Sequence, residues 1–214
     1  MSNSIHELAA KWVQEQLADD LTGHDWYHIK RVTALGRYLL KGTEANSNVV
    51  ILSCLLHDLA DDKVVESEEA GRQLIVEWLI THHVAQDTID HIISIISTMS
   101  FKGGNGVPME TIEGQIVQDA DRLDALGAIG IARTFTYSGH KQQAMYNPEL
   151  STRENMSVSE YRQGTSSAVH HFYEKLFKLP ELMNTQKARI LANERADFMK
   201  KYLEQFYSEW SFEA

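Results

Sequence analysis

Cysteine and proline are scarce in this chain, which has 214 residues and contains one Cys and three Pro. The single thiol, Cys54, cannot close an internal disulfide, so a disulfide-stapled secreted scaffold is excluded. Hydrophobic residues make up 43% of the chain and charged residues 23%, which is typical of a folded soluble protein and not of a disordered segment. A chain of this length buries roughly 70% of the surface that it exposes when unfolded, so its core needs no covalent support.

Long apolar runs and an excess of positive charge are also missing. The longest apolar stretch, from Val49 to Leu56, is interrupted by Ser53 and is far too short to cross a bilayer. No basic segment followed by an apolar run opens the sequence, so we expect no secretory signal and a cytoplasmic protein. The formal net charge of −10 disfavours nucleic acid and anionic membranes as partners. A small phosphorylated ligand remains compatible if a metal ion or a basic pocket reverses the local sign.

Apolar residues recur at helical spacing almost throughout the chain, and the alternation typical of strands is missing. Capping boxes predict that helices begin at Ser4 and Ser157. The helices that we expect cover residues 4–17, 25–41, 47–59, 67–80, 87–96, 110–137, 161–178 and 185–210. Loops are expected at the glycine-rich segment 101–108 and over 138–157, which is long enough to be a candidate lid. The sequence therefore predicts an all-α helical bundle.

Polar residues interrupt two of the apolar helical patterns. His28 shares one stripe with Val32 and Leu39, so it faces the core. His57 and Asp58 end the most apolar helix, where burying an uncompensated carboxylate costs on the order of several kcal/mol. The structural alternatives are a hydrogen-bonded core histidine and a salt bridge at a helix end.

Two acids also lie on the apolar face of the predicted helix 110–137. Asp121 and Asp124 share one stripe of that helix. Arg122 or Arg133 would explain the acids structurally, but neither arginine falls on the same stripe. Histidines and aspartates from three helices form the mixed nitrogen and oxygen donor set that suits a divalent metal in a helical core. The sequence alone therefore favours a metal site.

These residues resemble the H, HD and D motifs of the HD-domain superfamily of metal-dependent phosphohydrolases. The motif residues are His28, the pair His57 and Asp58, and Asp121. Their flanks resemble the bacterial YedJ and YpgQ-like branch, and the matching segments are 24–32, 57–63, 118–133 and 171–176. A lone His-Asp dipeptide would carry little information, but four motifs in order are specific. The resemblance implies an all-helical HD-domain fold and hydrolysis of phosphate esters or anhydrides, with nucleotides as the expected substrates.

The resemblance further implies that one divalent metal ion is bound by His28, His57, Asp58 and Asp121. Two imidazoles and two carboxylates leave coordination positions open for a water molecule and a phosphoryl oxygen. The sequence does not distinguish Mn, Mg, Fe, Ni and Co as the native metal.

Other charged residues near the motifs are candidates for the remaining chemistry. Asp61 and Asp62 follow Asp58 by three and four residues, so either could activate the attacking water, with Asp61 as the first choice and exposed capping acids as the alternative. Phosphoryl transfer also needs cations around the substrate. The substrate-binding candidates are Arg31, Lys63, Arg122, His171 and Lys175. A solvated helix face is the alternative for the last two, and pairing with Asp119 or Asp124 is the alternative for Arg122.

We interpret residues 1–214 as a single HD-type domain. The metal motifs lie at 24–133, the candidate lid at 138–157, and C-terminal helices at 158–210 complete the cleft. The expected activity is metal-dependent hydrolysis of a small phosphorylated substrate, with a nucleotide as the expected class. Hydrolysis of a cyclic nucleotide or another phosphodiester is one alternative, and a nucleotide-binding sensor without turnover is another. The sequence leaves the oligomeric state open, including a homodimer.

Overall fold

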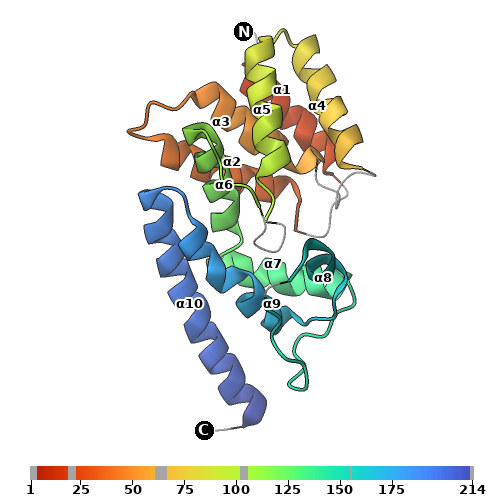
Figure 1. Ribbon diagram of the computed structural model, residues 1–214, viewed down its shortest axis with the longest axis vertical. Helices are drawn as coiled ribbons and strands as arrows, with labels where there is room; N and C mark the ends of the chain where they lie inside the picture. The colour runs from red at the N-terminus through yellow and green to blue at the C-terminus, as the bar shows by residue number, and fades with distance from the viewer. Residues whose placement is uncertain (1–3, 19–22, 61–66, 102–105, 155, 213–214) are drawn as a thin grey trace. The chain divides into compact units, whose positions relative to one another are not determined.

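A computed structural model of the chain describes residues 4–18, 23–60, 67–101, 106–154 and 156–212. Helices dominate these residues, and no strand occurs among them, which confirms the all-α fold class (Figure 1). None of the helices in the described ranges is long and apolar enough to cross a membrane. Contacts divide the chain into two compact units, residues 1–121 and 122–214. The single-domain organisation stays a prediction.

In the described residues of the first unit there are six helical elements and most of a seventh. They are α1 (Ile5–Gln16), α2 (Trp26–Leu40), α3 (Ser47–Leu56), the 3-10 helix η1 (His57–Ala60), α4 (Glu68–Thr81), α5 (Gln86–Thr98) and α6 (Ile112–Asp124), which ends just beyond the unit. The predicted capping box of Ser4 and Glu7 is present at α1. The helix expected from Ser47 is capped instead by Asn46, because the Asn46 side chain accepts hydrogen bonds from the next backbone N–H groups.

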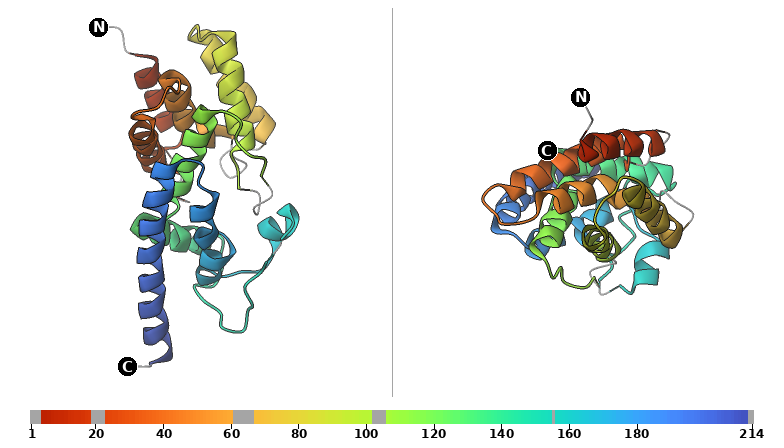
Figure 2. Two further views of the ribbon diagram at one scale, coloured as in Figure 1. Left: turned by 60° about the vertical axis from the view of Figure 1, so that its left-hand side comes forward. Right: turned by 90° about the horizontal axis from the view of Figure 1, so that it is seen from above.

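The core of the first unit is built around α3. Every residue of α3 from Val49 to Leu56 is buried, as the nearly uniform apolar sequence predicts. Helices α2, α5 and α1 pack against α3, and α4 and α5 lie side by side (Figures 1 and 2). A Cβ atom at Gly36 would lie 2.8 Å from the Cys54 sulfur, so α2 approaches α3 closely only because residue 36 is glycine. This approach places the start of α2 near the end of α3.

The part of the second unit that the structure describes contains the last residues of α6 followed by five further helical elements. They are α7 (Gly127–His140), α8 (Val158–Gln163), α9 (Ala168–Glu174), the 3-10 helix η3 (Leu176–Leu182) and α10 (Gln186–Ser211). Helix α10 packs against α7 and η3, and α9 packs against α7 and η3 as well. Phe172 is fully buried within this unit. Thr185 caps α10, which matches the start predicted from the sequence.

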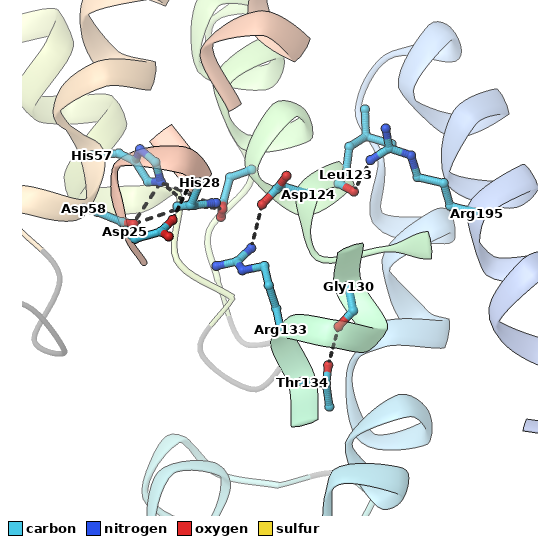
Figure 3. A network of polar contacts seen from close by, with 11 residues as sticks. Asp25, His28, His57, Asp58, Leu123, Asp124, Gly130, Arg133, Thr134 and Arg195 are labelled. Atoms are coloured by element: carbon cyan, nitrogen blue, oxygen red, sulfur yellow. Dashed lines mark hydrogen bonds and ion pairs between the residues drawn. The ribbon is translucent and has the colours of Figure 1, made fainter. Parts of the chain in front are cut away.

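The predicted helix 110–137 is wrong as one continuous element, because the chain breaks between α6 and α7. Leu126 is extended, and Gly127 has a φ of +75°, a value that favours glycine. Asp121 and Asp124 both lie on α6, but the break redirects α7, so the stripe proposed for the two acids does not continue beyond α6. Asp124 is buried, and its Oδ2 atom lies 3.0 Å from the Arg133 guanidinium (Figure 3). In a straight helix Arg133 would face away from Asp124, but the break allows the two residues to pair.

The predicted helix 161–178 is also interrupted. Its capping box of Ser157 and Glu160 is present, but α8 ends at Gln163 and α9 begins at Ala168. Pro180 lies inside the 3-10 helix η3, and because proline lacks a backbone N–H it disfavours continuation of the chain as an α-helix. Helix α7 extends to His140, so the long connection begins at residue 141, three residues later than expected.

Candidate metal centre

Three structural elements of the first unit carry the four predicted metal ligands. His28 lies in the first turn of α2, where its backbone N–H donates to the side chain of the capping residue Asp25 at 2.9 Å. His57 follows α3 directly and opens η1 together with Asp58. Asp121 lies near the C-terminal end of α6. The start of α2 thus positions His28, and the end of α3 positions His57 and Asp58.

The four side chains converge on one small region. The Nε2 atoms of His28 and His57 are 3.3 Å apart, and each lies 3.3 Å from an oxygen of Asp58. The Oδ1 atom of Asp121 lies 3.5 Å from His28 Nε2 and 3.8 Å from His57 Nε2. Figure 3 shows His28, His57 and Asp58 pointing toward one another. We refer to these four residues as the HHDD cluster.

The spacing of the donor atoms fits a divalent metal ion. Ligands bound at about 2.1 Å are separated by about 3.0 to 3.4 Å when they are neighbours in octahedral or tetrahedral geometry. The separations of 3.3 to 3.8 Å between the donor atoms lie in or just above this range. The nearest donor atoms of His28, His57 and Asp58 all lie within 4.8 Å of one another. The group therefore has the size that a single ion requires.

The hydrogen bonding of His57 prepares its ring for a ligand role. Nδ1 of His57 lies 3.0 Å from the Cys54 carbonyl oxygen, which can only accept, so Nδ1 carries the proton. In the neutral ring the Nε2 atom then presents a lone pair toward the HHDD cluster. A carbonyl that fixes the tautomer and the ring orientation in this way is a common partner of metal-binding histidines.

Burial and charge also fit a cation. The side chains of His28, His57 and Asp58 are 1%, 5% and 5% exposed, whereas that of Asp121 is 37% exposed. With neutral imidazoles the HHDD cluster holds two negative charges, and a buried carboxylate is costly unless positive charge compensates it. A divalent cation would balance both charges. The greater exposure of Asp121 marks the side of the cluster that solvent reaches.

Helix α6 is tethered close to Asp121. The Gln118 side chain lies one helical turn before Asp121, is buried, and donates a hydrogen bond from Nε2 to the Met99 carbonyl oxygen at 3.1 Å. Met99 follows the last residue of α5. The bond therefore fixes the turn of α6 that precedes Asp121 against the end of α5.

Cys54 lies beside the HHDD cluster, and its thiol is buried. Burial, followed by the negative charge of Asp121, raises the pKa of the Cys54 thiol to about 12. The thiol is therefore a poor nucleophile at neutral pH. Its contribution is the backbone carbonyl that binds His57 and the sulfur that packs against Gly36.

The remaining predicted site residues are placed as follows. Asp61, Asp62 and Lys63 lie outside the described residues. Arg31 lies on α2, one turn after His28, and is half-buried. Arg122 lies on α6 and donates to the Leu182 carbonyl oxygen. His171 lies on α9 of the second unit and Lys175 is the residue that ends it. Their roles in binding substrate stay predictions.

One residue at the HHDD cluster received no role from the sequence. The ring of His24 meets the ring of His28 edge to face, with centroids 5.9 Å apart. The two residues are four positions apart, but His24 precedes the capping residue Asp25, so helical periodicity does not predict the contact. The feature of the sequence that could have indicated this contact is the short spacing between His24 and His28 at a helix start.

Comparison with known proteins assigns the chain to a family. Residues 25–126 match the HD domain family. The uncharacterized protein YpgQ of Bacillus subtilis (strain 168) is 38% identical over 201 residues, which cover 93% of this chain and 90% of that protein. A crystal structure from Lactobacillus plantarum has 40% identity and a TM-score of 0.89 over 100% of both chains. An HD-superfamily hydrolase from Bacillus thuringiensis has 42% identity and a TM-score of 0.74 over 96% of both chains.

The helical fold and these similarities define a hydrolase of the HD superfamily, as the sequence motifs imply. The chain belongs to the HD domain family and is a metal-dependent phosphohydrolase of the YpgQ-like type. A structure of Bacillus subtilis YpgQ has been solved in complex with ADP, with 35% identity and a TM-score of 0.76 over 95% of this chain and 97% of that chain.

Proposed function

We propose that the chain hydrolyses a phosphate ester or pyrophosphate bond of a nucleotide and that the HHDD cluster holds the single divalent metal ion for this reaction. The observation that carries the proposal is the convergence of two imidazole and two carboxylate side chains, with the donor atoms of His28, His57 and Asp58 3.3 Å apart. Four side chains of these two types, mostly buried, suit an oxygen- and nitrogen-binding divalent cation.

The substrate class rests on a relative. YpgQ of Bacillus subtilis binds ADP in a solved complex and shares 35% identity with this chain over nearly its whole length. A nucleoside phosphate is also the kind of ligand that a chain with a net charge of −10 binds only through a local cation, which a metal ion provides. We therefore propose a nucleoside di- or triphosphate as the substrate.

The residues of the HHDD cluster have distinct tasks in this proposal. The four residues would hold a divalent ion, which would supply Lewis-acid chemistry to a phosphoryl oxygen and to a water molecule. His57 offers Nε2 from a ring that the Cys54 carbonyl oxygen holds in one tautomer. Asp58 supplies negative charge from the buried side, while Asp121, the most exposed of the four, faces the side from which substrate and water arrive.

Further residues complete the proposed reaction. Asp61 takes a proton from the attacking water as the general base, and Asp62 is the second candidate. Charge that develops on the phosphoryl oxygens is stabilised by cationic or hydrogen-bonding side chains. We propose Arg31, Lys63, Arg122, His171 and Lys175 for this task.

The proposal is tested by assaying the purified full chain against a panel of phosphorylated compounds. The protein is stripped with a chelator and reloaded separately with Mn²⁺, Mg²⁺, Fe²⁺, Ni²⁺ and Co²⁺, and release of phosphate and pyrophosphate is followed. The panel contains nucleoside mono-, di- and triphosphates, cyclic nucleotides and sugar phosphates. Metal-dependent hydrolysis of di- or triphosphates is expected. Hydrolysis restricted to sugar phosphates or cyclic nucleotides, or unaffected by chelation, would contradict the proposal.

A further inference from the structure

A buried ion pair in the second unit joins Arg153 to Glu174. Arg153 Nε donates to Glu174 Oε1 at 2.8 Å, and its Nη2 donates to Oε2 at 2.7 Å, so the two planar groups meet through two parallel hydrogen bonds. The Arg153 backbone N–H also donates to Oε1 at 3.3 Å. The Glu174 side chain is 1% exposed and the Arg153 side chain 23%. A two-point contact of this kind specifies geometry more strictly than a single charge contact.

The pair gathers four segments that are separate along the chain. Arg153 belongs to the long segment 141–154 after α7, and Glu174 is the last residue of α9. Arg153 Nη1 donates to the Glu160 carbonyl oxygen of α8 at 2.8 Å, and the Ser166 hydroxyl donates to Glu174 Oε2 at 2.9 Å. A Cβ atom at Gly164 would clash with Arg153 Nη1, so the guanidinium occupies space that any larger residue at 164 would take.

Backbone hydrogen bonds attach the same segment to the other end of α9. The backbone N–H groups of Ala168 and Val169 donate to the carbonyl oxygens of Ala144 and Met145 at 3.0 and 3.1 Å. The buried His170 ring reaches the Leu150 carbonyl oxygen with Nε2 at 2.9 Å. The segment 141–154 is thus fixed along α9, with the Arg153–Glu174 pair at the C-terminal end.

The C-terminal end of α9 also carries two of the proposed substrate contacts. His171 lies three residues before Glu174, and Lys175 follows Glu174 directly. Lys175 ends the helix with φ −134° and ψ −58°, so the regular helical hydrogen bonding of α9 does not continue past this point. The contacts with Arg153 and Ser166 hold Glu174 in place in this turn.

We infer that Arg153, through Glu174, is a positioning residue that sets the orientation of His171 and Lys175 toward the substrate phosphates. The inference rests on the proposed function, in which these two side chains contact the nucleotide. Arg153→Lys keeps the positive charge but cannot make the two parallel hydrogen bonds. Glu174→Gln keeps the shape of the side chain and removes its negative charge. Both changes loosen the turn and leave the four residues of the HHDD cluster unaltered in sequence.

The experiment measures steady-state nucleotide hydrolysis by the Mn²⁺-loaded full chain. The variants are Arg153→Lys, Glu174→Gln, Lys175→Ala, His171→Ala and the double variant of Arg153→Lys with Lys175→Ala. Arg72→Lys is the matched control, because Arg72 pairs with Glu69 in an exposed contact on α4 of the first unit. Thermal melting and Mn²⁺ affinity are recorded for each protein, and Glu174→Gln is used for the conclusion if Arg153→Lys does not fold.

Arg153→Lys and Glu174→Gln are each expected to raise KM about fivefold or more, while Mn²⁺ affinity stays at the wild-type value. Arg153→Lys should raise KM by a smaller factor in the Lys175→Ala background than in the wild-type background. In that background the Lys175 contact that Arg153 positions is already absent. A purely structural role would give equal changes in both backgrounds and would overturn the inference.

The same data separate the inference from the proposed function. If Lys175→Ala and His171→Ala both keep the wild-type KM, the proposed substrate contacts are wrong and the inference falls with them. If those two variants raise KM and neither Arg153→Lys nor Glu174→Gln does, the contacts stand and only the positioning role is overturned.

Discussion

The Nε2 atoms of His28 and His57 lie 3.3 Å apart, although the two residues belong to different helical elements and are 29 positions apart in the chain. The Nδ1 proton of His57 is committed to the Cys54 carbonyl oxygen, so its Nε2 faces His28 as a lone pair. Carboxylate oxygens of Asp58 and Asp121 surround the same point. Such an arrangement of acceptors is what a cation requires.

Removing one carboxylate from the HHDD cluster should abolish metal binding. Asp58→Ala forfeits a negative ligand that lies 3.3 Å from both histidine Nε2 atoms. The control is Asp197→Ala, whose side chain is 67% exposed on α10. Metal content is measured by elemental analysis after purification. Retention of a full equivalent of metal by Asp58→Ala would remove Asp58 from the ligand set.

Metal removal should lower the stability of the protein. An ion that binds only the folded state adds about 2.7 kcal/mol to the free energy of unfolding when its free concentration is about 100 times its Kd. We expect the midpoint of thermal unfolding to fall on chelation and to recover when Mn²⁺ is restored. The same midpoint with and without chelator would show that the folded chain does not bind the ion.

The Arg153–Glu174 pair should make stability depend on pH in the acid range. Burial alone would raise the pKa of Glu174, but hydrogen bonds from Arg153 and Ser166 hold it below its ordinary value of 4.5. The unfolded chain then binds a proton more readily than the folded chain, so the stabilisation is present above pH 4.5 and is lost as the pH falls through the lower folded-state pKa.

Urea unfolding of the wild type and of Glu174→Gln over the range from about pH 3 to 6 measures this dependence. The difference in free energy of unfolding between the two proteins should be greatest at the upper end of the range and should shrink toward the lower end. A difference that stays constant with pH would show that the Glu174 charge does not contribute to stability.

The break between α6 and α7 predicts opposite effects for two glycine substitutions. Gly127 has a φ of +75°, and a Cβ atom there would lie 3.2 Å from the Arg195 side chain. Gly127→Ala should therefore destabilise the protein by about 1 to 2 kcal/mol. Gly139 lies within α7 with nothing near its Cβ position, so Gly139→Ala should stabilise by about 0.5 to 1 kcal/mol. Denaturant unfolding of both variants measures the sign of each change in the free energy of unfolding. A Gly127→Ala variant as stable as the wild type would contradict the account of the break.

Activation of the attacking water is tested at the acidic pair after η1. Asp61→Asn keeps the size of the side chain and removes its ability to accept a proton, so turnover should fall by about 10² to 10⁴-fold while metal stays bound. Asp62→Asn is the internal control, because adjacent side chains do not aim at one water. Loss of activity only in Asp62→Asn would exchange the two roles. Wild-type turnover in both would assign water activation to other groups.

The helix starts at Ser4 and Ser157 and the site residues on α2 and η1 could be predicted because their signals are local, whereas the choice of Asp121 over Asp124 came from the resemblance to the HD superfamily. Ser4 and Ser157 begin helices through side-chain hydrogen bonds within four residues, and His28 stands out on an apolar stripe of its own helix. The convergence of the cluster follows from burial of α3 against α2, which the uniform apolar sequence of α3 already indicates.

The features that were missed depend on contacts distant in sequence. The residues before Gly127 are good helix formers, and the break there is stabilised by the pairing of Asp124 with Arg133 and by the Arg195 side chain beside Gly127. Arg153 and Glu174 are 21 positions apart in segments of different type, so no helical or strand spacing relates them. Only the packed structure shows that they meet.

The most direct test of the central claim is an anomalous diffraction map of crystals grown with Mn²⁺. The account predicts one strong peak between the Nε2 atoms of His28 and His57 and the carboxylates of Asp58 and Asp121, at about 2.0 to 2.3 Å from each ligand. The peak should vanish in crystals of Asp58→Ala prepared in the same way. A strong peak elsewhere in the chain together with no peak among these four side chains would contradict the assignment of the metal centre.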